Sequence, residues 1–175
     1  MAIEHSLALL IFIGRAGDVL STLYVTPKLV LEGNPVVRRF KWPTIVLGFA
    51  LCAVPYFHVP LAIMVAVPSL LVTASNLSRG WMARALGERE VEQIILRVAA
   101  RGSLATTLTM YWTATAFVII AAAMLLWLSQ EDDERVQAFA IGLGLYGLAI
   151  AIHSTFFLVR MFRRARLAGG DAGSP

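Results

Sequence analysis

Between Lys41 and Arg79 the chain has no charged residue, and this uncharged run limits the fold more than any other feature. A membrane-spanning helix needs roughly 20 mainly apolar residues, so the run is too long for one ordinary span. Pro55 and Pro60 flank four residues at which we expect a tight turn. The run is therefore predicted to form two spans, over residues 43–57 and 59–77.

Three other apolar runs are separated by charged segments, which predicts further spans over residues 6–26, 104–128 and 136–159. Hydrophobic residues make up 58% of the 175 residues, whereas a soluble domain has about 45–50% apolar residues. The fold class is thus predicted to be an all-α integral membrane protein with a bundle of five transmembrane helices. We expect one membrane domain over residues 1–168 and a flexible tail over 169–175.

The charged stretch between the third and fourth spans also has an apolar periodicity. Val91, Ile94, Ile95 and Val98 recur at helical spacing, opposite Glu88, Glu92 and Arg97. This pattern predicts an amphipathic helix that lies in the interfacial, headgroup region of the bilayer.

Basic residues fall on one side of the predicted bundle. They occupy the loop over 28–41, the stretch over 79–101 and the segment after the fifth span, whereas the loop over 131–134 is acidic. Loops rich in Lys and Arg stay in the cytoplasm, so we expect a multi-pass inner (plasma) membrane protein with its N-terminus outside and its C-terminus cytoplasmic. Arg135 is the exception. Because the basic residues sit in short loops beside apolar spans, no nucleic-acid partner is expected.

Polar residues recur at one depth, in the cytoplasmic halves of four predicted spans. The first span carries Arg15, Asp18 and Thr22 as one helical stripe. A carboxylate in hydrocarbon must pair, become protonated or reach water. The predicted ligand-binding residues are Asp18, Thr22, Glu32, Asn34, Asn76 and His153. The alternatives are that hydroxyl groups bond their own helix backbone and that Arg15 is a purely structural partner of Asp18.

The segment after the first span, Glu32-Gly33-Asn34-Pro35, contains turn-forming residues. It forms either an ordinary cytoplasmic turn or a re-entrant segment that brings Glu32 and Asn34 to Asp18. Together with Asp18 and Thr22, it resembles the D-x-x-x-T…E-x-N-P pattern of a family of small, uncharacterised bacterial polytopic membrane proteins. The resemblance covers about the first quarter of the chain and implies a site without implying a reaction.

The fifth span has a face of small residues, namely Ala140, Gly144, Gly147 and Ala151. Small residues let another helix approach closely. The face is predicted to pack inside the bundle or, alternatively, to contact a second copy or a larger membrane complex.

The sequence predicts a small membrane protein that binds or translocates an ion or small ligand at a cytoplasm-facing polar site. Two alternatives remain: a non-catalytic accessory subunit of a larger complex, and an intramembrane enzyme using Asp18 and Glu32. No motif identifies a cofactor, and no ligand spacing selects a metal site from Asp18, Glu32 and His153.

Overall fold

The structure is a computed structural model that describes residues 2–25, 42–129 and 133–170, and these residues are almost entirely helical. The helices are α1 (Ala2–Val25), α3 (Trp42–Ala50), the 3₁₀ helix η1 (Leu51–Tyr56), α4 (Val59–Leu86), α5 (Glu88–Arg101), α6 (Leu104–Leu128) and α7 (Glu134–Gly170). Four of them, α1, α4, α6 and α7, are long and apolar enough to cross a membrane. The predicted all-α fold is confirmed, and these helices indicate a multi-pass membrane protein.

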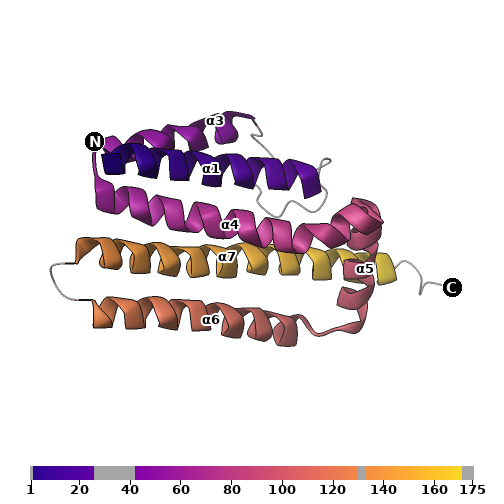
Figure 1. The fold of residues 1–175 in the computed structure, drawn as a ribbon. Coiled ribbons are helices and arrows are strands. Elements are labelled where there is room, and N and C mark those ends of the chain that lie inside the picture. The colour runs from indigo at the N-terminus through magenta and orange to yellow at the C-terminus, as the bar shows by residue number, and fades with distance from the viewer. Residues whose placement is uncertain (1, 26–41, 130–132, 171–175) are drawn as a thin grey trace.

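The long helices lie side by side, and α4 and α7 are in the middle (Figure 1). Helix α1 packs against α4, α6 packs against α7, and α3 and η1 pack against α1. Helices α1, α4 and α7 run in one direction, whereas α3 and α6 run in the other. We call the end of the bundle that holds α5 the α5 end. The opposite end holds the starts of α1, α4 and α7.

Helix α6 has the bounds that the sequence predicts, whereas α4 and α7 are longer than their predicted spans. Helix α4 continues from residue 77 to Leu86 and stops where Gly87 has a φ of +85°, a conformation that favours glycine. Helix α7 continues past Val159 because the arginine-rich segment that follows favours helix and contains no Gly or Pro until Gly169. The first part of the charged stretch, residues 79–86, therefore belongs to α4, whereas the residues of the predicted amphipathic helix lie in α5.

The predicted span over 43–57 is divided into α3 and η1, and the predicted turn follows at Phe57 and His58. Pro55 lies inside η1, and because it has no N–H it cannot form an α-helical hydrogen bond there. The two helices together extend about 25 Å, less than the roughly 30 Å thickness of the hydrocarbon core. This segment is thus less regular than predicted, and it is not among the four helices long enough to cross a membrane.

Many apolar side chains on the long helices face outward. Leu20 is 65%, Phe117 68% and Trp127 83% exposed. Contiguous apolar surface of this kind is costly in water, whereas lipid tails cover it without cost. The outward-facing surface therefore agrees with a membrane location.

Glycines fix the close approach of α7 to both of its long neighbours. A Cβ on Gly142 would lie 3.1 Å from Val67 Cβ and 3.2 Å from the backbone of Met64, so α7 lies directly against α4 there. A Cβ on Gly147 would lie 3.0 Å from the side chain of Ile119 on α6. The predicted small-residue face thus packs inside the bundle, and its two alanines, Ala140 and Ala151, are buried.

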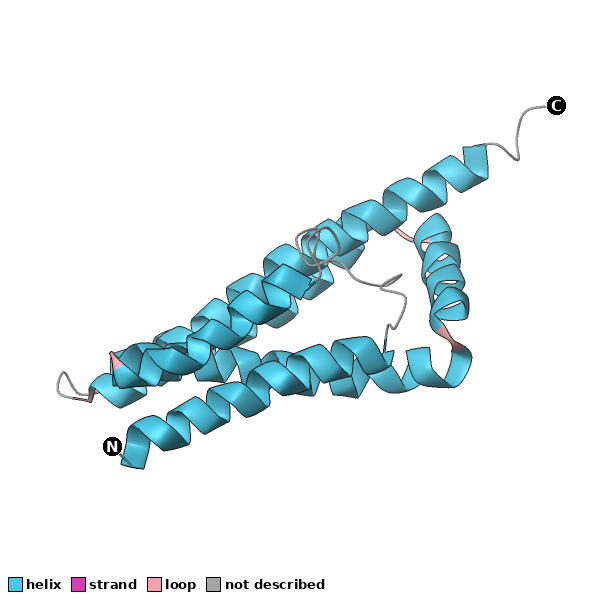
Figure 2. Ribbon diagram, turned by 90° about the horizontal axis from the view of Figure 1, so that it is seen from above, coloured by secondary structure: helices cyan, strands magenta, loops and turns pink. Residues whose placement is uncertain are grey.

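Helix α5 bridges α4 and α7 where these two helices diverge (Figure 2). Its Ala99 and Leu96 pack against Leu158 and Phe162 of α7. Val98, which precedes Ala99, is 66% exposed. Glu92, predicted on the opposite polar face, instead pairs with Arg164 of α7.

Candidate functional site

Two glycines and two hydroxyl residues bring α1 and α4 into close contact beside the candidate site. A Cβ on Gly14 would lie 3.0 Å from Ser69 Cβ, and a Cβ on Gly17 would lie 2.7 Å from Thr73 Cγ2. Thr73 Oγ1 donates to the Gly14 carbonyl oxygen at 2.8 Å and also lies 3.0 Å from the Ser69 carbonyl oxygen of its own helix. This contact fixes the register in which the next turns of the two helices meet.

The next turn joins Asp18 and Thr22 of α1 to Asn76 of α4. Asn76 Nδ2 donates to Asp18 Oδ1 at 3.1 Å and to Thr22 Oγ1 at 3.3 Å. The two acceptors lie one turn from each other on α1, so one amide group on α4 can donate a hydrogen bond to each of them across the α1–α4 interface. We call Arg15, Asp18, Thr22 and Asn76 the Asp18 cluster.

Arg15 is the cationic member of the cluster. Its Nη1 lies 3.8 Å from Asp18 Oδ2, and its Nε donates to the Gly48 carbonyl oxygen of α3 at 3.4 Å. A Cβ on Gly48 would lie 2.9 Å from Arg15 Nη2. The absence of a side chain at Gly48 thus leaves room for the guanidinium group between α1 and α3.

The ion pair between Arg15 and Asp18 is loose and partly open. Strong charge-assisted hydrogen bonds are about 2.7–2.9 Å long, well below the 3.8 Å separation found here. The side chains of Arg15 and Asp18 are 29% and 28% exposed. The contact between the two charged groups is therefore long, and both side chains are partly exposed.

Asp18 lies in the half of α1 that is nearer the α5 end of the bundle. It is 4.5 residues past the midpoint of Ala2–Val25, which corresponds to roughly 7 Å along the helix. Beyond it, the Arg84 guanidinium of α4 lies 4.9 Å from the centroid of the Tyr24 ring. Polar contacts between α1 and α4 thus continue from Thr73 toward the α5 end.

The structure brings together Asp18, Thr22, Asn76 and Arg15, four of the residues singled out in the sequence. His153 is exposed on α7, and within the described residues no hydrogen bond joins it to this group. His153 lies on the same face of α7 as Gly142 and Tyr146. Tyr146 Oη donates to the Leu71 carbonyl oxygen of α4, and His153 follows two turns later, nearer the α5 end. Glu32 and Asn34 lie outside the described residues.

Several hydroxyl groups bond their own helix, as the alternative interpretation expects. Ser21, Ser69, Thr107, Thr115 and Thr155 donate to backbone carbonyl oxygens three or four residues earlier. The Thr73 hydroxyl differs because it also donates to a carbonyl oxygen of another helix, at Gly14 of α1. The sequence interpretation gave no special role to Thr73, Gly14, Gly17 or Gly48, although the small-residue spacing from Gly14 to Gly17 was a usable signal for close packing.

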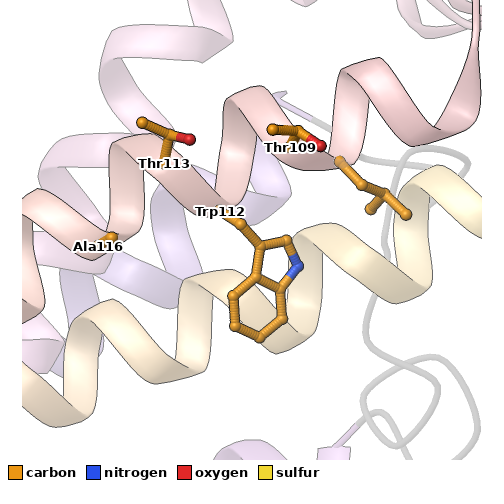
Figure 3. A pocket seen from close by; sticks show the side chains of 5 residues that line it. Thr109, Trp112, Thr113 and Ala116 are labelled. Atoms are coloured by element: carbon orange, nitrogen blue, oxygen red, sulfur yellow. The ribbon is translucent and has the colours of Figure 1, made fainter.

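A second feature is a shallow groove of about 450 Å³ along α6 (Figure 3). Its lining residues are Leu108, Thr109, Trp112, Thr113 and Ala116. The Trp112 ring extends toward α7, where its Nε1 donates to Thr155 Oγ1 at 3.1 Å. The groove therefore places two exposed threonines on the outward side of a membrane-length helix.

No family model matches this chain, and neither a curated protein nor a solved structure matches it. The resemblance to small polytopic membrane proteins through Asp18, Thr22 and the Glu32–Pro35 segment therefore stays an expectation. Among the described residues, no group of three or more His, Cys, Asp and Glu side chains is arranged to hold a metal ion.

Proposed function

We propose that this protein binds a small polar or charged ligand at the Asp18 cluster, inside the membrane and from the cytoplasmic side. The observation that carries the proposal is the loose, partly exposed Arg15–Asp18 pair, whose charged groups lie 3.8 Å apart beside the Asn76 amide. A structural ion pair gains most from short charge-assisted hydrogen bonds of about 2.7–2.9 Å. The Arg15–Asp18 pair has no such short bond between its two charged groups.

The charges of the cluster favour a particular class of ligand. Arg15 compensates Asp18, so a bare cation would meet both an attractive and a repulsive charge. A molecule with a cationic group and an anionic group would instead exchange one loose contact for two close ones, to Asp18 and Arg15. The proposal therefore favours a dipolar ligand, such as an amino acid, over a simple ion.

The distribution of arginines supports the proposed orientation. Eight described arginines lie in α5, the last turn of α4 and the last part of α7, all near the α5 end, and one, Arg135, lies at the opposite end. The positive-inside rule then puts the α5 end in the cytoplasm and the start of α1 outside. In this topology α3 and η1 form a short fifth crossing, and Asp18 lies on the cytoplasmic side of the membrane centre.

Ligand-dependent stability tests this proposal. The purified protein in lipid nanodiscs is heated with glycine or alanine as dipolar probes, spermidine as a cation or succinate as an anion. We expect the amino acids to raise the unfolding temperature most, because only they satisfy both charges. Asp18→Asn and Arg15→Gln each abolish the effect.

The matched control is Ser78→Ala, two residues beyond Asn76, because the Ser78 hydroxyl donates to the Ser75 carbonyl oxygen of its own helix. The control keeps the full response. The proposal is contradicted if amino acids raise the unfolding temperature of Asp18→Asn as much as that of the unaltered protein. It is also contradicted if neither the amino acids, the cation nor the anion raises the unfolding temperature.

A second candidate function, an accessory subunit of a larger membrane complex, is supported by the α6 groove. Ala105, Thr109, Thr113 and Ala116 follow helical spacing and are exposed, and such small residues allow a partner helix to approach closely. If this is the function, Thr113→Trp fills the groove and reduces the size of the complex in native gel electrophoresis, while Gly144→Ala on the covered face does not. The enzymatic alternative depends on Glu32, which lies outside the described residues.

A further inference from the structure

The α5 end carries a strong excess of positive charge. Residues 88–101 and 160–170 contain seven arginines and three glutamates. Two of the glutamates are already paired, since Arg97 Nη2 lies 3.1 Å from Glu90 Oε1 and Arg164 pairs with Glu92. These two pairs involve two of the seven arginines.

Three exposed arginines flank the joint between α5 and α7. Arg163 and Arg166 each follow a buried residue of that joint, Phe162 and Ala165. Arg101 ends α5 next to Gly102, where a Cβ would lie 3.9 Å from Phe162 Cζ. Within the described part of the chain, no carboxylate is found paired with any of the three.

The position of this joint along the helices corresponds to the membrane surface. Trp81 is 69% exposed and lies about 33 Å from the first residue of α4, close to the roughly 30 Å thickness of the hydrocarbon core. Exposed tryptophans are typical of the headgroup boundary. Helix α5 begins seven residues later, at Glu88, so the α5–α7 joint lies in the headgroup region.

We propose that Arg101, Arg163 and Arg166 bind the phosphate group of an anionic phospholipid at the α5–α7 joint. Guanidinium groups bind phosphate oxygens through paired N–H donors. The excess of positive charge favours an anionic headgroup over a zwitterionic one, because the positively charged choline group of a zwitterionic lipid would be repelled by the same arginines. The bound lipid also covers the exposed Val98 with its glycerol and upper acyl region. This site is separate from the Asp18 cluster and does not depend on it.

Titration of the detergent-solubilised protein with phosphatidylglycerol or phosphatidylcholine, followed by native mass spectrometry, tests the proposal. We expect preferential binding of phosphatidylglycerol, with a loss of about five-fold in apparent affinity for each arginine replaced by Gln. Arg163→Lys keeps the charge but loses the paired N–H donors, so we expect it to bind less tightly than the unaltered protein and more tightly than Arg163→Gln. Arg135→Gln, an exposed arginine at the opposite end, serves as the matched control and leaves binding unchanged.

Inorganic phosphate, added as a competitor, distinguishes the lipid from a free phosphate. We expect phosphate to compete only weakly because the acyl chains hold the headgroup at the joint. Full displacement by phosphate would assign the arginines to a soluble anion and overturn the lipid proposal. Equal binding of the two lipids, or unchanged phosphatidylglycerol binding in Arg101→Gln/Arg163→Gln/Arg166→Gln, would also overturn it. The single variant Arg166→Gln gives the same comparison if the triple variant does not fold.

Discussion

The amide nitrogen of Asn76 on α4 lies 3.1 Å from Asp18 Oδ1 on α1, across 58 residues of sequence. The same nitrogen lies 3.3 Å from Thr22 Oγ1. An amide and a carboxylate at this depth each need a partner, because hydrocarbon supplies none. Their pairing joins the two helices, and the second carboxylate oxygen, Asp18 Oδ2, lies 3.8 Å from Arg15 Nη1.

Loss of the Asn76 amide should destabilise the α1–α4 contact. Asn76→Leu leaves Asp18 and Thr22 without their shared donor, and we expect a loss of about 1–3 kcal/mol in unfolding free energy. Unfolding in lipid or mixed micelles measures it. Leu77→Ala, at an adjacent exposed position, should change stability by at most about 0.5 kcal/mol. Equal stability of Asn76→Leu and the unaltered protein would mean that this hydrogen bond contributes nothing.

Two glycines on α7 should respond very differently to alanine. At Gly142 the new Cβ would lie 3.1–3.2 Å from Val67 and the Met64 backbone, whereas at Gly144 its nearest neighbour, Ala122 Cβ, is 3.6 Å away. We expect Gly142→Ala to cost about 1–3 kcal/mol through overpacking. Gly144→Ala should be neutral or slightly stabilising, since alanine favours helix. Unfolding free energies of the two variants check the order, and the reverse order contradicts the packing described here.

Gly48→Ala should move Arg15 without unfolding the protein. The new Cβ would lie 2.9 Å from Arg15 Nη2, which is the end of a flexible side chain, so the guanidinium group can shift at little cost. We expect nearly unchanged thermal stability together with weaker ligand-dependent stabilisation by amino acids. Ala53→Ser, at an exposed position of η1, is the control. It should keep both the thermal stability and the stabilisation by amino acids. Full ligand response in Gly48→Ala would show that the position of Arg15 is unimportant.

The Glu92–Arg164 pair should hold α5 on α7. The Glu92 side chain is only 14% exposed, so Glu92→Lys places two like charges in a partly enclosed joint. We expect faster hydrogen exchange and faster proteolysis in α5 for this variant. The charge-swapped variant Glu92→Arg/Arg164→Glu should restore protection. If α5 of Glu92→Lys is as protected from hydrogen exchange and proteolysis as in the unaltered protein, the apolar contacts of Ala99 and Phe162 alone hold α5 on α7.

Hydrophobic run length predicted the long helices well, because lipid imposes a nearly fixed number of apolar residues on each crossing. The bounds of α6 were correct, and the turn at His58 was correct because two prolines mark it. Run length does not report where a helix stops outside the membrane. Helices α4 and α7 therefore extend further than predicted, to Leu86 and Gly170.

Part of the site was also predictable. Asp18, Thr22 and Asn76 stood out because polar side chains are costly in hydrocarbon, and the structure brings them together with Arg15. Their pairing depends on the register of α1 against α4, which Gly14, Gly17 and Thr73 set through contacts between residues about 55 positions or more apart. Helical periodicity of a single segment contains no information about such a register. The Arg15–Gly48 contact was missed for the same reason.

Sided cysteine labelling tests the central claim, that the Asp18 cluster is open to water from the cytoplasmic side. In a Cys52→Ala background, Thr22→Cys is treated with a membrane-impermeant thiol reagent in right-side-out and inside-out vesicles. Arg166→Cys marks the α5 end, Ser129→Cys marks the opposite end, and Thr115→Cys, which is buried, marks an inaccessible position. We predict that Thr22→Cys reacts only in inside-out vesicles, together with Arg166→Cys. A Thr22→Cys that stays unreactive like Thr115→Cys, or that reacts from the side of Ser129→Cys, would contradict the claim.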